Sequence, residues 1–197
     1  MKVIFLDNDG VICLSNNWGS RYKKQKEWGG RKLSMTSWDM PVEYRFDNFD
    51  EKAIKVLNTI LEETGAEIVV SSDWRLHANL EQLGEYYLSQ GISKKPIAVT
   101  ELFKDIFPSE WSQLRFRAEL ELERSMEIQN WLEQHPEVTN WVAIDDLNMS
   151  IEFLSAHFAS KDGSDSKPGL SNFVHTPRSN EGIKQSGIKQ KIIKFLK

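Results

Sequence analysis

The sequence predicts an α/β fold in which helices cover both faces of a parallel sheet. Short apolar runs alternate along the chain with segments whose apolar residues have helical spacing. Acidic or hydroxyl residues directly follow three of these runs. Regular alternation of strands and helices favours a parallel sheet. Ligands of such sheets bind at the carboxyl ends of the strands, so we expect a functional site at that edge.

The composition is that of an ordinary globular protein. The 197 residues are 40% hydrophobic and 27% charged, which suits one domain over residues 1–197. The net charge of -4 argues against a protein whose whole surface binds nucleic acid, although not against a local basic groove. With Cys13 as the single cysteine no internal disulfide can form, and neither a signal peptide nor a membrane span is visible. We therefore expect the cytoplasm or another reducing compartment.

Residues 2–6 form an apolar run that predicts the first buried strand. Asp7 and Asp9 follow it two positions apart, so in extended chain they point the same way, and Gly10 lets the backbone turn away. Such a pair of carboxylates costs energy unless a cation holds it, and Mg²⁺ with oxygen ligands would do so. Asp-x-Asp-Gly is also a common turn sequence, so the later motifs decide between a metal site and a capped turn.

Residues 12–49 have little periodicity and predict an irregular flap or small cap inserted after the first strand. Basic residues alternate there with aromatic ones: Arg21, Tyr22, Lys23, Lys24, Lys26, Trp28, Arg31 and Lys32, with Trp18 and Trp38 nearby. Two interpretations are open. The segment is either a solvated loop whose aromatic rings pack on the domain, or a lid whose charges and rings bind an anionic substrate.

Residues 50–65 predict a helix that Asp50 caps and Gly65 ends. Its apolar residues keep the spacing of one buried face. Residues 66–70 follow as a second buried strand, which ends in the string Ser71-Ser72-Asp73-Trp74-Arg75. This polar string therefore stands at the end of a strand, as Asp7 and Asp9 do.

After this string, Asp73 is expected to cap a helix that runs to about Gln90, with Trp74 packed beside the site. The other expected elements are a strand at 97–100, a loop packed by its own aromatic residues at 101–120, a helix at 120–134, a strand at 140–144, a helix at 150–158, a loop at 159–171, a strand at 172–176 and a closing helix from about 188. The strand at 140–144 runs directly into Asp145-Asp146. This acidic pair either belongs to the site or caps the helix after it.

Three strand ends thus carry Asp-x-Asp-Gly-Val, Ser-Ser-Asp-Trp-Arg and Ile-Asp-Asp, in that order. This order resembles the haloacid dehalogenase (HAD) superfamily, whose members have a Rossmann-like sheet and are mostly Mg²⁺-dependent phosphatases. Together with Glu127-Ile128-x-x-Trp131-Leu132, the second motif resembles the HAD domains associated with RNA-repair proteins. The resemblance spans nearly the whole chain, from Val3 to the closing helix.

The resemblance implies a role for each acidic residue. Asp7 would be the nucleophile that forms an aspartyl-phosphate, and Asp9 would protonate the leaving oxygen and then activate water. Mg²⁺ would be held by Asp7, the backbone carbonyl of Asp9 and Asp145. Asp146 would hold the metal through a water molecule or orient a basic partner.

The resemblance also implies residues that bind the substrate. Ser71 would donate a hydrogen bond to the phosphoryl oxygens, with Ser72 as the alternative, and Asn8 and Arg75 are further candidates. The chain departs from the family where a lysine usually steadies the nucleophile and the phosphate, because Arg124 stands at the expected place. We assign Arg124 that role, with Arg75 as its rival. The alternative is that Arg124 is an exposed arginine paired with nearby glutamates.

We therefore expect a Mg²⁺-dependent phosphomonoesterase that acts through an aspartyl-phosphate. Two other functions stay open: a catalytically inert HAD-like binding module, and a phosphotransferase whose acceptor is not water. The flap is short enough to leave the site open to a phosphorylated macromolecule, either a nucleic-acid end or a phosphoprotein such as one with phosphotyrosine. The basic closing helix is also compatible with a further C-terminal domain.

Overall fold

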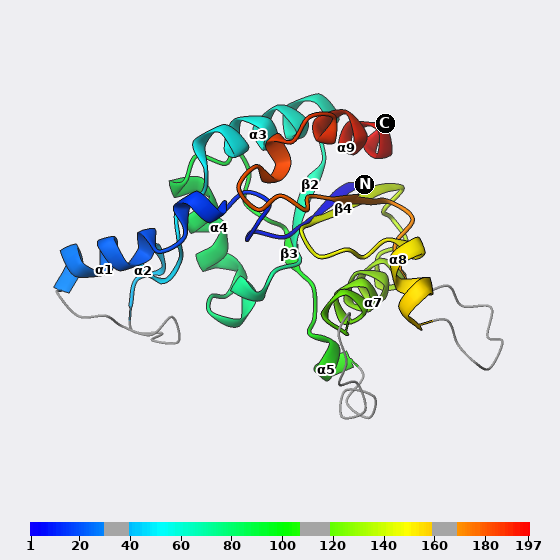
Figure 1. Cartoon of the computed structure of the whole chain (residues 1–197), viewed down its shortest axis with the longest axis horizontal. Helices are drawn as coiled ribbons and strands as arrows, with labels where there is room; N and C mark the ends of the chain where they lie inside the picture. The colour runs from blue at the N-terminus through cyan, green and yellow to red at the C-terminus, as the bar shows by residue number, and fades with distance from the viewer. Residues whose placement is uncertain (30–39, 107–118, 159–168) are drawn as a thin grey trace.

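Five parallel strands form the centre of the molecule in the computed structural model, which describes residues 1–29, 40–106, 119–158 and 169–197 (Figure 1). The strands are β1 (Lys2–Leu6), β2 (Glu67–Val70), β3 (Ala98–Val99), β4 (Asn140–Asp145) and β5 (Phe173–His175). Their order is β3-β2-β1-β4-β5, which places β1 in the centre. The strands thus step outward from β1 in both directions, as in Rossmann-like sheets, and the predicted fold class is confirmed.

Helices cover both faces of this sheet, and β1 contributes to both because successive side chains alternate. Ile4 and Leu6 are buried in one cluster with residues of α3 (Glu51–Thr64) and α9 (Ile188–Leu196). Val3 and Phe5 are buried in a second cluster with Ile128 of α7 (Glu119–Gln134). Figure 1 shows α3 and α9 on one side of the strands and α7 on the other. Both layers hold β1 rigidly, and with it the chain that follows.

The ends of α3 are those that the sequence predicts. The carboxylate of Asp50 accepts hydrogen bonds from the backbone N–H groups of Lys52 and Ala53, at 3.0 and 2.9 Å. Gly65 ends the helix in the left-handed region, with φ of 69°. Two residues separate the end of the helix from the start of β2, so a short turn connects α3 to the sheet.

The segment after β2 is not the continuous helix that we expect up to Gln90. A short 3₁₀ helix, η2 (Asp73–Leu76), is followed by the separate helix α4 (Leu80–Ser89). The second helix starts afresh because Asn79 and Gln82 form a capping box, in which each side chain accepts a hydrogen bond from the other residue's backbone N–H. The expectation that Asp73 caps this helix is wrong, because Ser72 stands at the cap position of η2 and no side chain caps it.

Residues 12–49 hold more regular structure than the sequence predicts. Ile12, Cys13 and Leu14 are fully buried, so they belong to the core and not to a flap. They are followed by η1 (Ser15–Asn17), α1 (Ser20–Gly29) and α2 (Val42–Arg45), while residues 30–39 lie outside the described part of the chain. The sequence does not predict α1 because polar residues surround the helix and leave no apolar face. In Figure 1, α1 and α2 extend away from the sheet.

The strands and the longer helices of the second half follow the predicted order, and α8 (Ile151–Phe158) is one of them. The short elements α5 (Phe103–Ile106) and η3 (Gly182–Lys184), a 3₁₀ helix, are not predicted. The loop expected over 101–120 begins with α5, and its residues 107–118 lie outside the described ranges, as do residues 159–168 of the loop expected over 159–171. Among the residues that are described, no helix has both the length and the apolar character needed to cross a membrane.

Candidate active site

The register of the central strands brings three polar residues together at the carboxyl edge of the sheet. Leu6, the last residue of β1, pairs with Val70 of β2 on one side and with Ile144 of β4 on the other. Asp7, Ser71 and Asp145 come next along these strands and therefore lie beside one another. The ladder continues into them, since the backbone N–H of Asp7 donates to Ile144 O at 3.1 Å and that of Ser71 donates to Leu6 O at 3.0 Å.

Asp7, Asp145 and Asp146 form a cluster in which one oxygen from each carboxylate lies within 4.8 Å of the other two. Burial raises the pKa of Asp145 to about 6, and burial together with the neighbouring Asp145 raises the pKa of Asp7 well above its ordinary value. Partial burial also raises the pKa of Asp146. Several like charges share such a site at low cost only when a cation joins them. The donor set consists entirely of oxygen, so these residues fit Mg²⁺.

Arg124 projects from α7 into this cluster. Its Nη1 donates to Asp7 Oδ1 at 2.8 Å, to the carbonyl oxygen of Ser71 at 2.9 Å and to Asp145 Oδ2 at 3.2 Å. Burial alone would lower the pKa of this guanidinium, but the carboxylates of Asp145 and Asp7 raise it above its ordinary value. The alternative of an exposed arginine is wrong, because only 8% of Arg124 is accessible to solvent. Arg124 thus contacts the residue that the family resemblance implies as the nucleophile, at the place where the family usually has a lysine.

Ser71 and Ser72 carry two buried hydroxyl groups directly after the end of β2. Within the described part of the chain, neither hydroxyl has a hydrogen-bond partner. Buried polar groups are almost always hydrogen-bonded, so an unpaired hydroxyl at a strand end points to a ligand that would accept its hydrogen bond. This agrees with the predicted role of Ser71, and of Ser72 as its alternative.

Asp9 lies on the loop after β1; the residue is exposed, but its carboxyl is partly covered where it meets Trp74. The Nε1–H of Trp74 donates to Asp9 Oδ2 at 2.8 Å. The surrounding protein removes water from the Asp9 carboxyl and raises its pKa, while hydrogen bonds from Trp74 and Cys13 act in the opposite direction. The carboxyl of Asp9 is not part of the carboxylate cluster, so metal binding by Asp9 stays a prediction that concerns its backbone carbonyl.

Gly10 allows the loop of Asp9 to pass close to Asp146. It has φ of 72°, and a Cβ atom built on it would lie 2.2 Å from Asp146 Oδ2. A side chain at this position would therefore displace one of the clustered carboxylates. The glycine is needed both for its left-handed backbone and for this close approach.

Comparison with known families agrees with this geometry. A sequence model described as "HAD domain in Swiss Army Knife RNA repair proteins" matches residues 3–177, which include every residue of the site. The chain belongs to this family. It is therefore a HAD domain, from a superfamily of hydrolases and phosphatases that usually use Mg²⁺. No curated protein and no solved structure matches the chain.

Two residues of this HAD domain that we predict to bind substrate have other partners. The guanidinium of Arg75 donates to Thr100 Oγ1 and to Glu127 Oε2, and only 5% of its side chain is exposed. The side chain of Asn8 is buried and accepts a hydrogen bond from the hydroxyl of Tyr87 at 2.6 Å. The structure therefore brings neither side chain to the carboxylate cluster, and it favours Arg124 over Arg75 as the cation of the site.

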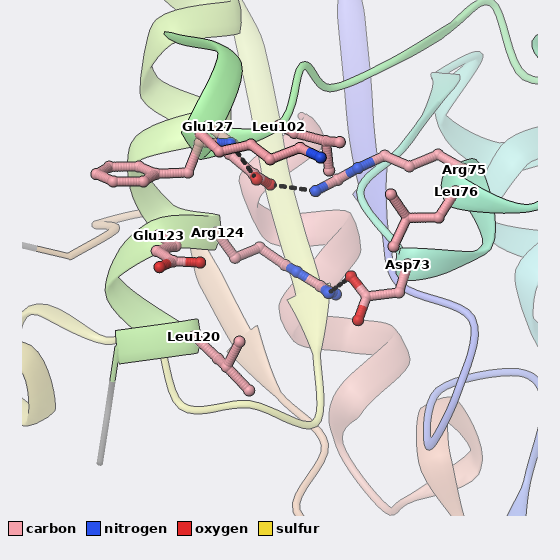
Figure 2. Close-up of a pocket in the computed structure, with 10 residues that line it drawn as sticks. Asp73, Arg75, Leu76, Leu102, Leu120, Glu123, Arg124 and Glu127 are labelled. Carbon is pink, nitrogen blue, oxygen red and sulfur yellow. Dashed lines mark hydrogen bonds and ion pairs between the residues drawn. The ribbon is translucent and has the colours of Figure 1, made fainter. Parts of the chain in front are cut away.

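A pocket of about 200 Å³ lies beside Arg124 (Figure 2). The side chains that line it connect α7 with the segment after β2. Arg124 and Glu127 are one turn apart on α7, and Figure 2 shows Arg124 reaching Asp73 on η2 while Arg75 reaches Glu127. The Arg75–Glu127 pair is buried on both sides. It ties α7 to the segment after β2 and so supports the position of Arg124. Apolar residues line the same pocket: Leu76, Leu102, Phe103 and Leu120.

The sequence does not predict the contacts that Asp73 and Trp74 make in this HAD domain. Asp73 forms an ion pair with Arg124 Nη2 at 2.9 Å, and Trp74 donates to Asp9 instead of only packing beside the site. Both contacts join segments that are far apart in the chain, and no local spacing encodes them. The restart of the helix at Leu80, by contrast, has a local signal, because Asn79 and Gln82 have the residue types and spacing of a capping box.

Magnesium is expected to stabilise this domain through the carboxylate cluster. In EDTA, Asp146→Asn should be at least as stable as the wild type, because the substitution removes one of three mutually repelling carboxylates. At a concentration 100 times its Kd, Mg²⁺ should stabilise the wild type by about 2.7 kcal/mol and the variant by much less. Thermal unfolding with and without Mg²⁺ measures both effects. Asp73→Asn is the control, because Asp73 contacts Arg124 from outside the cluster. An undiminished Mg²⁺ shift in Asp146→Asn would contradict the assignment.

Proposed function

We propose that this HAD domain is a Mg²⁺-dependent phosphomonoesterase that acts through an aspartyl-phosphate on Asp7. The observation that carries the proposal is the position of Arg124 Nη1, which is within 3.2 Å of both Asp7 and Asp145 inside a cluster of three carboxylates. A buried arginine between a nucleophile and metal ligands places fixed donors where a phosphoryl group would carry its charge. The unpaired hydroxyl of Ser71 adds a further donor at the same edge.

The residues of the chain supply the two steps of the reaction. In the first, a carboxylate oxygen of Asp7 attacks phosphorus, the ester P–O bond breaks, and Asp9 gives its proton to the departing oxygen. In the second, water attacks the phosphorus of the aspartyl-phosphate, Asp9 takes a proton from the water, and inorganic phosphate leaves with Asp7 restored. Arg124 and Ser71 would hold the phosphoryl oxygens throughout. A bound Mg²⁺, held by Asp7, Asp145 and Asp146, would screen the negative charges of phosphate and nucleophile.

We propose that the substrate is a phosphate at the end of a nucleic acid. Trp18, half exposed at 51%, lines a pocket of about 710 Å³ together with Lys23 and Lys52. Asp50 and Lys184 line the same pocket and pair with each other at 3.1 Å, so Lys23 and Lys52 are the cations proposed to bind phosphates. Exposed aromatic rings that stack on bases, combined with cations that track phosphates, are typical of single-stranded nucleic-acid sites. Trp18 also donates to Cys13 O at 3.3 Å, on the loop that carries Asp9. The family is described by its occurrence in RNA repair proteins, which supports the same class of substrate.

The basic cluster predicted in the flap contributes to this surface only in part. Lys23 of α1 is exposed and lines the pocket of Trp18, whereas Lys26, Tyr22 and Trp28 are exposed but do not line it. Lys24 instead donates to the carbonyl oxygen of Phe46 at 2.8 Å, so it holds the segment between α2 and α3 in place. The flap thus uses some of its basic residues for its own structure and leaves others for a ligand.

Substrate preference tests this proposal. We expect a 3′- or 5′-phosphorylated oligonucleotide to have a higher kcat/KM than a mononucleotide or a phosphotyrosine peptide. Trp18→Ala should lower kcat/KM for the oligonucleotide by roughly 5- to 150-fold, the equivalent of about 1–3 kcal/mol for one stacked base. The same variant should leave p-nitrophenyl phosphate turnover nearly unchanged, because none of the clustered carboxylates lines the pocket that holds Trp18.

Trp28→Ala is the matched control for this experiment. Trp28 is exposed to a similar degree, 45%, but stacks on Tyr44 with the ring centroids 5.3 Å apart. Its loss should not change the preference for oligonucleotides. A phosphopeptide preferred over every oligonucleotide would instead identify a protein phosphatase, and equal losses in both variants would contradict a base-stacking role for Trp18.

A further inference from the structure

The hydrogen bond between Trp74 and Asp9 distinguishes the two oxygens of the Asp9 carboxyl. The indole Nε1–H can only donate, so Asp9 Oδ2, at 2.8 Å, must act as an acceptor. An oxygen that accepts such a bond is less basic than the other oxygen, so a carboxyl group that protonates a leaving group does so preferentially from the other one. Oδ1 is therefore the favoured proton donor, and the indole, together with the hydrogen bond between Cys13 and Asp9, sets the direction in which it faces.

The indole itself is held firmly by other aromatic rings. Only 3% of Trp74 is exposed, and its ring stacks on Phe46 at 4.3 Å and on Phe49 at 5.3 Å, with interplanar angles of 6° and 16°. Tyr86 packs edge-on against it, with the centroids 5.8 Å apart. We call Phe46, Phe49, Trp74 and Tyr86 the aromatic platform. It leaves the indole little freedom to rotate, so the position of its N–H is defined before any ligand binds.

Polar contacts connect the aromatic platform to the rest of the molecule. The hydroxyl of Tyr86 donates to the carbonyl oxygen of Asp47 at 2.8 Å, and Lys24 of α1 donates to that of Phe46 at 2.8 Å. The backbone between α2 and α3 is thus bonded both to α4, which carries Tyr86, and to α1. A carboxyl on a loop would otherwise sample several rotamers, and the hydrogen bond from the fixed indole restricts that freedom.

We propose that Trp74 is a positioning residue for Asp9: its indole N–H holds Oδ2 so that Oδ1 faces the leaving oxygen of the substrate. The inference rests on the proposed phosphatase function and concerns the same site. Proton transfer to a leaving group needs close alignment, and small displacements of a catalytic group cost large factors in rate. The effect of Trp74 should therefore appear only when the leaving group needs a proton.

Trp74→Phe tests this directly, because phenylalanine keeps an aromatic ring in the platform and removes the N–H donor. The two substrates are phenyl phosphate, whose leaving group has a pKa of about 10 as in tyrosine, and 2,4-dinitrophenyl phosphate, whose leaving group departs without a proton. For the variant, kcat/KM should fall roughly 10- to 100-fold with phenyl phosphate and change little with 2,4-dinitrophenyl phosphate. Asp9→Asn should show the same selectivity with a larger loss.

The ratio of the two kcat/KM values, measured on one sample, does not depend on the fraction of folded enzyme. Trp131→Phe is the matched control, because it makes the same change at another buried tryptophan, on the opposite face of the sheet. Its ratio should equal that of the wild type. The inference is overturned if the ratio for Trp74→Phe is unchanged, or if Trp131→Phe changes it equally. A wild type inactive on both substrates would instead contradict the proposed function.

Discussion

Asp7→Asn is expected to lower phosphatase turnover by several orders of magnitude while the fold stays intact. An amide is a poor nucleophile, so the first phosphoryl transfer cannot take place on residue 7. The fold should persist because asparagine has nearly the same size and removes one charge from a repulsive cluster. Arg124 keeps its contacts with Asp145 and Asp73 in this variant.

Turnover of p-nitrophenyl phosphate with Mg²⁺, together with thermal unfolding, measures these two effects. Asp73→Asn is the control: it also removes a carboxylate that pairs with Arg124, but its side chain is 68% exposed and lies outside the cluster. It should retain most of the turnover. If Asp7→Asn turned over at the wild-type rate, no aspartyl-phosphate could form on residue 7 and the mechanism would be wrong.

Arg124→Ala is expected to reduce kcat by roughly 10²–10³, the scale for loss of one preorganised donor to a transition state. The guanidinium contacts both Asp7 and Asp145, so its removal also leaves the buried carboxylates without their cation. Mg²⁺ should offset part of this repulsion, but it does not replace the donors to the phosphoryl oxygens. The reduction in kcat should therefore remain when Mg²⁺ is saturating.

Arg75→Ala is the comparison variant, because Arg75 is expected to be structural where Arg124 is expected to act on the phosphate. Glu127, the partner of Arg75, is buried with 5% of its side chain exposed, so removing Arg75 leaves a charge without its pair. We expect the free energy of unfolding to fall by about 3–5 kcal/mol, as for other broken buried pairs. Turnover per folded molecule should change much less than in Arg124→Ala. Equal losses of turnover per folded molecule in the two variants would mean that Arg75 also acts at the phosphate.

The sequence predicts the sheet and the acidic strand ends because both are local properties. The runs that end at Asp7, Ser71 and Asp145 are short, apolar and followed at once by polar residues, so their carboxyl ends could be placed without a structure. Parallel pairing then requires these ends to meet. The position of Arg124 followed from the family resemblance, and the structure adds its contacts with Asp7 and Asp145.

What the sequence does not predict depends on tertiary contacts. The helix α1 has no apolar face, so nothing in its periodicity marks it as a helix. Arginine is usually exposed, but Arg45 is almost fully buried. Its guanidinium donates hydrogen bonds to the carbonyl oxygens of Met40 and His77. The bond from Trp74 to Asp9 joins residues 65 positions apart. Each of these features is determined by where other elements pack and not by neighbouring residues in the sequence.

Covalent trapping of phosphate on Asp7 tests the central claim most directly. In Asp9→Asn, 2,4-dinitrophenyl phosphate should still phosphorylate Asp7, because its leaving group needs no proton, but hydrolysis of the intermediate should be slow without the general base. We expect release of one equivalent of dinitrophenolate per enzyme. Mass spectrometry after acid quenching should find one phosphoryl group on the peptide that contains Asp7. Steady release of dinitrophenolate with no phosphoryl group on that peptide would contradict the account.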